Sequence, residues 1–386
     1  MSKSERNDMR TATEIAREHL TLAKILRTHI WPVFKKRQCK RLGVFPYPLK
    51  NPFLPLLYSG MSAEIVALPS LKCGLRLANL GHIDAVHIQF EDQFTRRTRF
   101  EAKKTPEKAA GDFIAMLDGY LTRGGRLAWT LHDSESPYQS DFSPHLHDIR
   151  SFLATNAHVV QVFNTAGKEH AISVLKTPPE RVVVIAHPSY FGAYGNAPAS
   201  VPPPDLRRFL SFGGIRPFKG IEQFMDALGQ ADIGSTFKKL VIAGSSPDGK
   251  NRDLEAHFPS NRTVDLRYGM VKDKDVPTFF ADTDFTVVNY RRVLTSGVAA
   301  LSMTMGKPII GVDRGGLKEA IPIENHSLLY DPNDPNGLIK VIERACEMSP
   351  ADHLFLQKKC RDFAQDIHPL VQSRHLEEAF KTHGIL

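Results

Sequence analysis

The stretch Ser211–Gly220, with the sequence SFGGIRPFKG, decides how this chain is expected to fold. A short apolar run at positions 208–210 comes just before it and predicts a buried strand. The residues after it place apolar side chains on one face of a helix, namely Ile221, Phe224, Met225 and Leu228. The sequence therefore predicts a strand that leads through a glycine-bearing turn into a helix.

The chemistry of this turn suits an anion. Gly213 and Gly214 let backbone N–H groups approach a ligand closely, and a helix start offers unpaired N–H donors with a partial positive charge. Arg216 and Lys219 add two full positive charges, so a phosphate or diphosphate is the expected ligand. The stretch matches neither the Walker pattern nor Gly-x-Gly-x-x-Gly. Taken alone, it is equally compatible with a tight turn that carries two solvated basic side chains.

Length and composition are those of a globular protein with two or three domains. The chain has 386 residues, of which 42% are hydrophobic and 24% charged. No apolar run approaches the ~20 residues that span a bilayer, and no secretory signal is visible at the start. The four cysteines show neither CxxC pairs nor metal-ligand spacing. We expect reduced thiols in a cytoplasmic protein, with no metal site.

The positive charge is confined to one end of the chain. The net charge is +8, and residues 1–50 hold twelve Lys and Arg against four acids, so the remainder is neutral. The same segment has a run of apolar residues at helical spacing, with Trp31 near the end of the run. This pattern predicts a basic amphipathic helix on an anionic membrane surface. The alternatives are a helix docked on the first domain and a nucleic-acid contact. The confinement of the charge argues against a nucleic-acid-binding face spread over the fold.

Strands alternate with helices in both halves, which predicts an α/β fold of two doubly wound Rossmann-like domains facing a cleft. The expected strands are 43–46, 64–69, 85–90, 126–131, 158–163 and 181–186, then 208–212, 239–243, 264–268, 285–289, 308–312 and 327–330. Helices are expected at 106–121, 166–176, after Gly220, and at 276–281, 296–305, 338–348 and 351–383. The expected parts are a basic segment 1–41, a first domain 42–200, a proline-rich linker 201–206, a second domain 207–365 and a C-terminal helix 366–386 that can cross back.

Polar side chains follow several of these strands. Ligands of such sheets bind at the carboxyl ends of the strands, so these side chains predict a polar pocket, although any one histidine can equally be a satisfied core residue. In the first domain they are His87, Glu91, Asp92, His132, Asp133, Asn164, His187 and Tyr190. In the second domain Tyr290 is followed by Thr295, Ser296 and Gly297 at a helix start, and Glu319 follows a later strand. That helix start is a second place suited to a phosphate, or else a plain Thr/Ser cap.

These motifs together resemble those of GT-B glycosyltransferases. Gly213–Gly220 is similar to the phosphate loop of their second domain, and 284–297 with Gly306-Lys307-Pro308 to the nucleotide-sugar region. In the first domain, 51–58, His87 with Phe90, 130–132 and His187 with Tyr190 also match family positions. Within the family, the chain most resembles the bacterial GDP-mannose:glycolipid 4-β-mannosyltransferases of exopolysaccharide synthesis, the xanthan type. It departs in lacking the two glutamates of common retaining enzymes, whose positions hold Val293 and Leu301, and in having Asn289 before Tyr290.

The resemblance implies a metal-independent, inverting hexosyltransferase that needs no cofactor beyond its donor, GDP-mannose. Its acceptor would be a lipid-linked glycan, which would keep the enzyme peripheral on the inner face of the cell membrane. Donor contacts are expected from Gly213, Gly214, Arg216, Lys219, Tyr290, Thr295, Ser296, Gly297 and Glu319. The expected general base is Asp133 or Glu91, and His132 is expected to contact the sugar or diphosphate. His87, Asn164, His187 and Tyr190 are expected to line the acceptor side.

Several alternatives remain open from the sequence. The donor could be a UDP- or ADP-sugar. The missing glutamates could mark a non-catalytic protein that binds sugar nucleotides. A two-domain sugar-nucleotide epimerase would share the architecture by fold analogy alone. Nucleic-acid binding through the basic N-terminal segment would show steep salt dependence.

Overall fold

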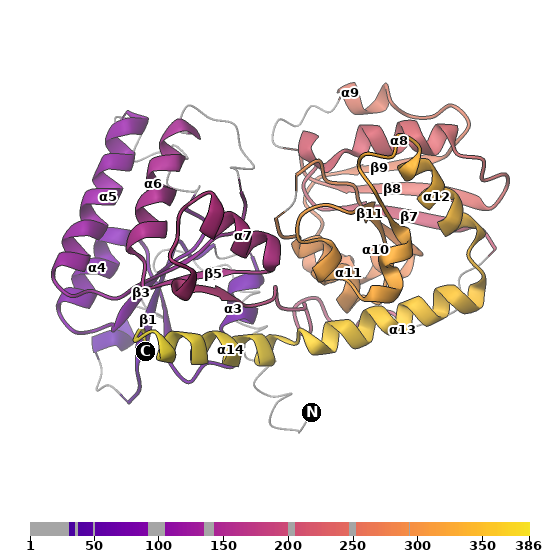
Figure 1. The fold of residues 1–386 in the computed structure, drawn as a ribbon. Helices are drawn as coiled ribbons and strands as arrows, with labels where there is room; N and C mark the ends of the chain where they lie inside the picture. Colours follow the sequence, from indigo (N-terminus) through magenta and orange to yellow (C-terminus); the bar gives the residue numbers. More distant parts are fainter. Residues whose placement is uncertain are drawn as a thin grey trace. The chain divides into compact units, whose positions relative to one another are not determined.

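The computed structural model describes residues 31–34, 38–48, 51–91, 105–134, 143–199, 205–246, 252–292 and 294–386. The chain divides into two compact units, which we call the first unit (Met1–Ala186 with Pro369–Leu386) and the second unit (His187–His368). The division falls before the stretch 201–206 in which a linker was expected, and the C-terminal segment returns to the first unit (Figure 1). Most of the basic segment 1–41, together with Asp92, residues 201–204 and Val293, lies outside the described residues.

The first unit is built on a six-stranded parallel sheet in the order β2-β1-β3-β4-β5-β6. Its strands are β1 (Arg41–Phe45), β2 (Glu64–Ala67), β3 (Ala85–Ile88), β4 (Leu127–Thr130), β5 (Val159–Val162) and β6 (Val182–Val184). Its helices are α3 (Phe53–Leu57), α4 (Leu71–Asn79), α5 (Pro106–Thr122), α6 (Ser143–Asn156), α7 (Thr165–Ser173) and α14 (Pro369–Thr382). Helix α14 packs on α3, and its Leu376 and Phe380 join the apolar core beside β1. The last helix of the chain therefore completes the first sheet's cover.

The second unit is a second six-stranded parallel sheet, in the order β12-β11-β10-β7-β8-β9. Its strands are β7 (Arg207–Phe212), β8 (Phe237–Gly244), β9 (Val264–Tyr268), β10 (Phe285–Val288), β11 (Ile309–Val312) and β12 (Leu329–Tyr330). Its helices are α8 (Ile221–Gln230), α9 (Arg252–Glu255), α10 (Val276–Ala281), α11 (Gly297–Thr304), α12 (Gly337–Glu347) and α13 (Pro350–Asp366). Counted from β7, the order is that of a Rossmann sheet, whose strand order reverses between β7 and β10.

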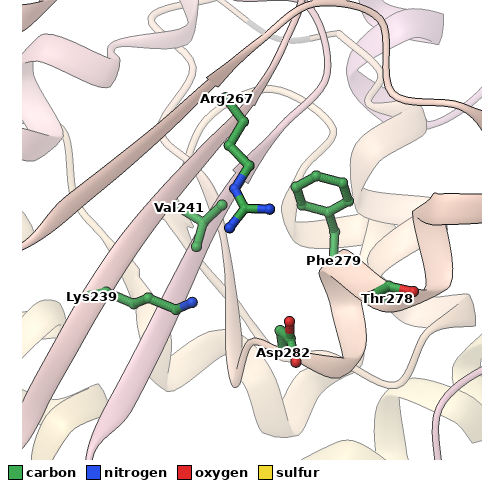
Figure 2. A pocket seen from close by; sticks show the side chains of 6 residues that line it. All are labelled: Lys239, Val241, Arg267, Thr278, Phe279 and Asp282. Atoms are coloured by element: carbon green, nitrogen blue, oxygen red, sulfur yellow. The ribbon is translucent and has the colours of Figure 1, made fainter.

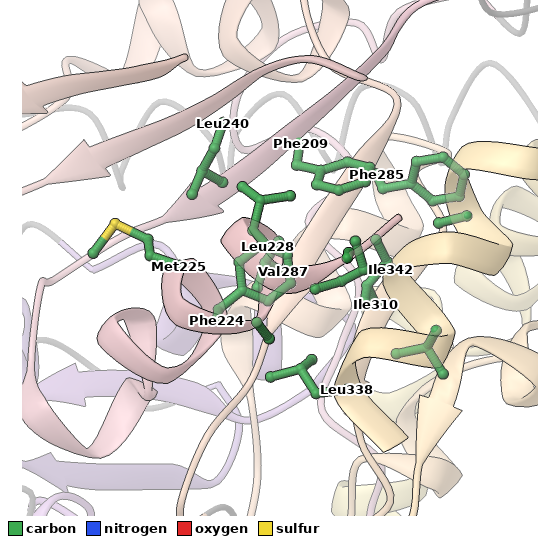
Figure 3. Close-up of a cluster of buried hydrophobic side chains, with 14 of the residues drawn as sticks. Phe209, Phe224, Met225, Leu228, Leu240, Phe285, Val287, Ile310, Leu338 and Ile342 are labelled. Atoms are coloured by element: carbon green, nitrogen blue, oxygen red, sulfur yellow. The ribbon is translucent and has the colours of Figure 1, made fainter. Parts of the chain in front are cut away.

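The core of the second unit shows why the opening stretch folds as it does. Helix α8 presents its apolar face, including Phe224, Met225 and Leu228, to the sheet. Figure 3 shows these side chains gathered with Phe209 and Phe285 of neighbouring strands. Burial of that face holds the helix start in place at the end of β7. The predicted strand, turn and helix are therefore confirmed.

All twelve expected strands are present, most of them shortened by one or two residues. The stretch 351–383, which was expected to be helical, forms the two helices α13 and α14, and α14 corresponds to the C-terminal helix expected at 366–386. The break lies before Pro369, because a proline disfavours helical backbone in the residue before it. Four helices were not predicted, namely α3, α4, α6 and α9. Helix α3 contains Pro55 and is buried along its whole length, so it shows no amphipathic period.

Candidate functional site

Backbone hydrogen bonds join the loop after β7 to the end of β8. Gly213 has a φ of +89°, its N–H donates to Ala243 O at 2.9 Å, and Ile215 N donates to Ser245 O at 2.8 Å. A methyl group on Gly244 would come within 1.8 Å of Gly213 O, so the two backbones touch. Glycine is required at both positions, one for its backbone conformation and the other for this close approach. The loop is thus held rigidly at the carboxyl edge of the sheet.

Lys219 points back over this loop. Its side chain is buried, and Nζ donates to Phe212 O at 2.9 Å while lying 5.2 Å from the centre of the Tyr290 ring. A methyl group on Gly213 would lie 3.2 Å from Lys219 Nζ and 3.6 Å from the side chain of Val298. Val298 belongs to the first turn of α11. The ammonium group, the glycine turn, Tyr290 and the start of α11 therefore meet at one place, and a phosphate site there stays a prediction.

Hydrogen bonds join the loops after β7 and β10. Gly220 has a φ of +59°, and a methyl group there would come within 2.4 Å of Asn289 O. Asn289 Nδ2 donates to Gly220 O at 2.9 Å, and its Oδ1 accepts from Tyr330 Oη at 2.6 Å. Asn289, which departs from the resembling family, thus bonds through its amide nitrogen to the loop after β7 and through its amide oxygen to β12.

The N-terminus of α11 completes this edge. Ser296 caps the helix, because its Oγ accepts from Ala299 N at 3.2 Å, and Thr295 just before it is half-buried. A methyl group on Gly297 would lie 2.9 Å from Tyr190 Oη and 3.5 Å from His187 Nε2. His187 and Tyr190 were expected in the first domain. They belong instead to the second unit, because the chain enters that unit directly after β6.

His187 and Tyr190 offer neutral polar groups to this helix start. Their rings stack with 5.7 Å between centres. His187 Nδ1 donates to Pro188 O at 2.9 Å, so the neutral ring keeps its lone pair on Nε2. Burial lowers the pKa of His187 to about 4 and raises the pKa of the Tyr190 hydroxyl above its usual range. Near pH 7 this pair is therefore uncharged, and the positive charge of the site comes from elsewhere.

Two further predicted donor contacts lie along the same edge. Arg216 is half-buried, and a methyl group on Gly214 would lie 3.7 Å from its Nε. Glu319 is exposed in a short 3-10 helix, Lys318–Ala320, that follows β11. Arg216 follows β7 and Glu319 follows β11, and strand β10 lies between these two strands in the sheet. A role for either in donor binding remains a prediction.

In the first unit, His132 is held by an aromatic cage at the carboxyl end of β4. It stacks on Phe90 with 4.0 Å between ring centres, and the rings of Phe53 and Phe163 lie 5.5 and 5.3 Å away. Phe90 has a φ of +40°, a left-handed conformation that costs a non-glycine residue about 1–3 kcal/mol. The strain places its ring against His132. The half-buried Asp133 follows directly, so both predicted residues stand at this edge.

Glu91 does not suit the role of general base. It is 1% exposed, its Oε1 accepts from Arg150 Nε at 2.7 Å, and its Oε2 accepts from Trp129 Nε1 at 3.2 Å. Arg150 also donates to Ser134 O at 2.7 Å. The buried ion pair holds the loop that carries His132, and Arg150 and Trp129 together bond both carboxylate oxygens. We therefore keep Asp133 alone as the candidate base.

His87 and Asn164 are also engaged in structural contacts. His87 is fully buried, with its ring nitrogens 2.8 Å from Tyr58 Oη and 2.7 Å from Thr130 Oγ1, and burial lowers its pKa to about 3. Asn164 caps α7 by accepting from Gly167 N at 2.8 Å. An asparagine directly before a helix is itself a capping signal, which the sequence already contained. We leave both residues out of the proposed site.

The sequence of the second unit is similar to that of a known protein family. Residues 207–348 match the family model of the glycosyl transferases group 1. The match spans the sheet of the second unit, and the loop after β7 lies within it. No curated protein matches the chain by sequence.

Solved structures show that the described part of the chain has the GT-B fold. HepE from Anabaena, crystallised with UDP and glucose, matches with a TM-score of 0.65 at 14% identity, covering 89% of this chain and 100% of that one. Sucrose-phosphate synthase from Thermosynechococcus elongatus matches with a TM-score of 0.61 at 17% identity over 81% of this chain and 76% of its own. The catalytic domain of starch synthase IV from Arabidopsis thaliana, bound to ADP and acarbose, matches at 0.57 and 14% over 86% and 77%.

A small cavity elsewhere in the second unit is a poor candidate for the site. Figure 2 shows it between β8, β9 and α10, with Arg267 over the ring of Phe279. Its volume is about 40 Å³, which suits a few water molecules rather than a sugar nucleotide. Arg267 donates to Asp265 at 2.8 Å, so its charge is already paired.

Among the described residues, no group of three or more His, Cys, Asp or Glu side chains is arranged to hold a metal ion. None of the helices in this part of the chain is long and apolar enough to cross a membrane.

Proposed function

We propose that the chain is a glycosyltransferase that takes its sugar from a nucleoside diphosphate sugar and binds the diphosphate in the second unit, at the carboxyl ends of β7 and β10. The observation that carries this proposal is the meeting of Lys219 Nζ, the Gly213 turn and the first turn of α11. The match of residues 207–348 to the glycosyl transferases group 1 supports the same conclusion. Sheets with this strand order bind nucleotides where the order reverses.

The chemistry follows from the charge that develops during transfer. As the bond from the sugar's anomeric carbon to the diphosphate breaks, the leaving diphosphate gains negative charge. We propose that Lys219, the backbone N–H group of Gly214 and the start of α11 stabilise this charge, because the N–H of Gly213 is already bonded to Ala243 O. One well-aimed donor of this kind contributes about 3–4 kcal/mol to the transition state. Phe212 O holds the Lys219 ammonium in position, so little reorganisation accompanies the reaction.

The acceptor side of the reaction requires a base. We propose Asp133 as the group that takes the proton of the acceptor hydroxyl, with His132 beside it as a contact to the sugar or diphosphate. An inverting outcome is favoured because the positions of the two glutamates of retaining relatives hold Val293 and Leu301. Leu301 is buried within α11, so a carboxylate is absent from that place.

The identity of donor and acceptor is a finer part of the proposal. The resemblance to the xanthan-type enzymes favours GDP-mannose and a lipid-linked glycan at the cytoplasmic face of a membrane. HepE was crystallised with UDP and glucose and starch synthase IV with ADP, so UDP- and ADP-sugars are the competing donors. A thermal-shift panel of the three nucleotide classes separates them, because a ligand at 100 times its Kd stabilises the folded state by about 2.7 kcal/mol.

The decisive test compares two buried lysines. Lys219→Met should lower transfer at least ~100-fold and abolish the thermal shift by the donor, since it removes a charge from the diphosphate. Lys307→Met is the matched control. Although Gly306-Lys307-Pro308 resembles part of the nucleotide-sugar region, Lys307 precedes β11 and so lies at the opposite, amino edge of the same sheet, where it is also buried and donates to a backbone carbonyl, Thr283 O at 2.7 Å. Normal turnover in Lys219→Met, or an equal loss of donor binding in Lys307→Met, would reject the proposed site.

Membrane attachment is tested separately. Deletion of residues 1–30 should reduce sedimentation with vesicles that contain anionic lipid and leave donor binding unchanged, because the charge excess of the chain lies in its first fifty residues. The described residues 31–34 should be retained, since Val33 is buried and its carbonyl accepts from Arg41. Equal sedimentation of the two proteins would count against a membrane role for this segment.

A further inference from the structure

A closed network of polar side chains lies beneath the carboxyl ends of β3, β4 and β5 and ends at His132. Its five members are buried, and each contacts the next through side-chain atoms. They are Tyr58, His87, Gln89, Thr130 and Gln161. Since water is excluded from these groups, the proton positions must be consistent throughout the network, and they can be worked out one contact at a time.

Thr130 provides the starting point. Its hydroxyl donates to Gln161 Oε1 at 2.9 Å and has only that one proton. His87 Nε2 at 2.7 Å and Gln89 Nε2 at 3.0 Å must therefore both donate to Thr130 Oγ1. Thr130 thus puts the ring proton of His87 on Nε2.

The next contacts follow from a neutral His87. Burial lowers the pKa of His87 to about 3, so the ring holds one proton near pH 7 and Nδ1 carries a lone pair. Tyr58, whose pKa burial raises well above the usual range, keeps its proton and donates it to this Nδ1 at 2.8 Å. Tyr58 Oη then accepts the second amide proton of Gln89 at 2.9 Å.

Both amide protons of Gln89 are now used, and its Oε1 faces His132 Nε2 at 2.7 Å. A carbonyl oxygen only accepts, so His132 must donate from Nε2. We infer that this network fixes His132 as the Nε2–H tautomer, and that Gln89 is the positioning residue that sets it. The lone pair of His132 then lies on Nδ1. This inference does not depend on the proposed function.

The opposite proton order is the competing arrangement. If both glutamine amides were turned over, Gln161 would donate to Thr130 and each later bond would reverse, leaving His132 protonated on Nδ1. In that order the amide oxygen of Gln89 would face Thr130 Oγ1 at 3.0 Å, and the Thr130 proton would already be donated to His87. One of the six hydrogen bonds of the network would therefore be lost. The order in the structure instead leaves Gln161 Nε2 without a partner among the described residues. The six satisfied contacts favour the Nε2–H form.

The tautomer can be measured in the protein without any donor or acceptor. We would label histidine with 15N, assign His132 by the signal lost in His132→Gln, and follow its two ring nitrogens by NMR. The wild type should show a protonated Nε2 and a pyridine-type Nδ1. Thr130→Val should move His132 toward the Nδ1–H form, because a valine would leave the buried Nε2–H of His87 without an acceptor and so favours the reversed order.

Thr286→Val is the matched control. Thr286 is equally buried in a strand, β10, and its Oγ1 is hydrogen-bonded to Ser302 Oγ at 2.6 Å, but it lies in the second unit. It should leave the His132 signals unchanged. If Thr130→Val does not fold, Gln161→Met removes the acceptor of the Thr130 proton and should shift the tautomer in the same direction. A protonated Nδ1 in the wild type, or an unchanged tautomer in the folded network variant, would overturn the inference whether or not the protein transfers sugar.

Discussion

Lys307 gives a prediction whose size can be worked from the structure. Its side chain is 5% exposed, and Nζ donates to Thr283 O at 2.7 Å. Burial lowers the pKa of this lysine from 10.5 to about 8, while the nearby carboxylate of Asp284 opposes the change. Asp284 itself forms an ion pair with Arg208, at 3.0 Å, which limits how far it can compensate.

The sign of the pH dependence follows from the lowered pKa. Between pH 8 and 10.5 the unfolded chain holds a proton that the folded protein has released, so unfolding takes up a proton and stability rises with pH. The full difference corresponds to about 3 kcal/mol, all of it a cost to the folded state near neutral pH. Between pH 7 and about pH 9.5 roughly 2 kcal/mol of that cost should disappear.

Urea denaturation of the wild type and of Lys307→Met at these two pH values measures the effect. Other groups titrate in the same range, among them Cys346, whose pKa burial raises to about 11. They are present in both proteins and cancel in the comparison. The free energy of unfolding of the wild type should gain about 2 kcal/mol relative to the variant. A difference that stays constant within about 0.5 kcal/mol would refute the burial argument.

Two further predictions concern stability. Arg150→Met should lower the free energy of unfolding by about 3–5 kcal/mol, because it leaves the Glu91 carboxylate buried without its partner. The double variant with Glu91→Leu should recover part of this loss. Chemical denaturation measures both changes, and a double variant no more stable than the single one would contradict the prediction. Gly220→Ala should cost more than the ~1 kcal/mol expected for a strained backbone alone, because its methyl group would meet Asn289 O at 2.4 Å. Gly234→Ala, with a φ of +48° and nothing within 4 Å, is its control, and equal losses would show that the contact does not matter.

The candidate site shows how far sequence patterns reach. The glycine turn, Lys219 and the Ser296 cap were predictable because each is encoded within a few neighbouring residues. Glu91 could not be dismissed in this way, since its partner Arg150 is fifty-nine positions away and only the packed sheet brings them together. The cage around His132 was missed for the same reason, because its rings come from three separated segments of the chain.

The sequence by itself determined the α/β class, the alternation of strands with helices, and the anion-suited turn at Gly213, because these depend on local periodicity and backbone freedom. Only the tertiary structure decided the strand order, which puts the reversal between β7 and β10, and the transfer of His187 and Tyr190 to the second unit. It also decided that His87 is a core residue, since burial is a property of the whole fold. Contacts between distant segments carry no local signal, so they become visible only once the chain is packed.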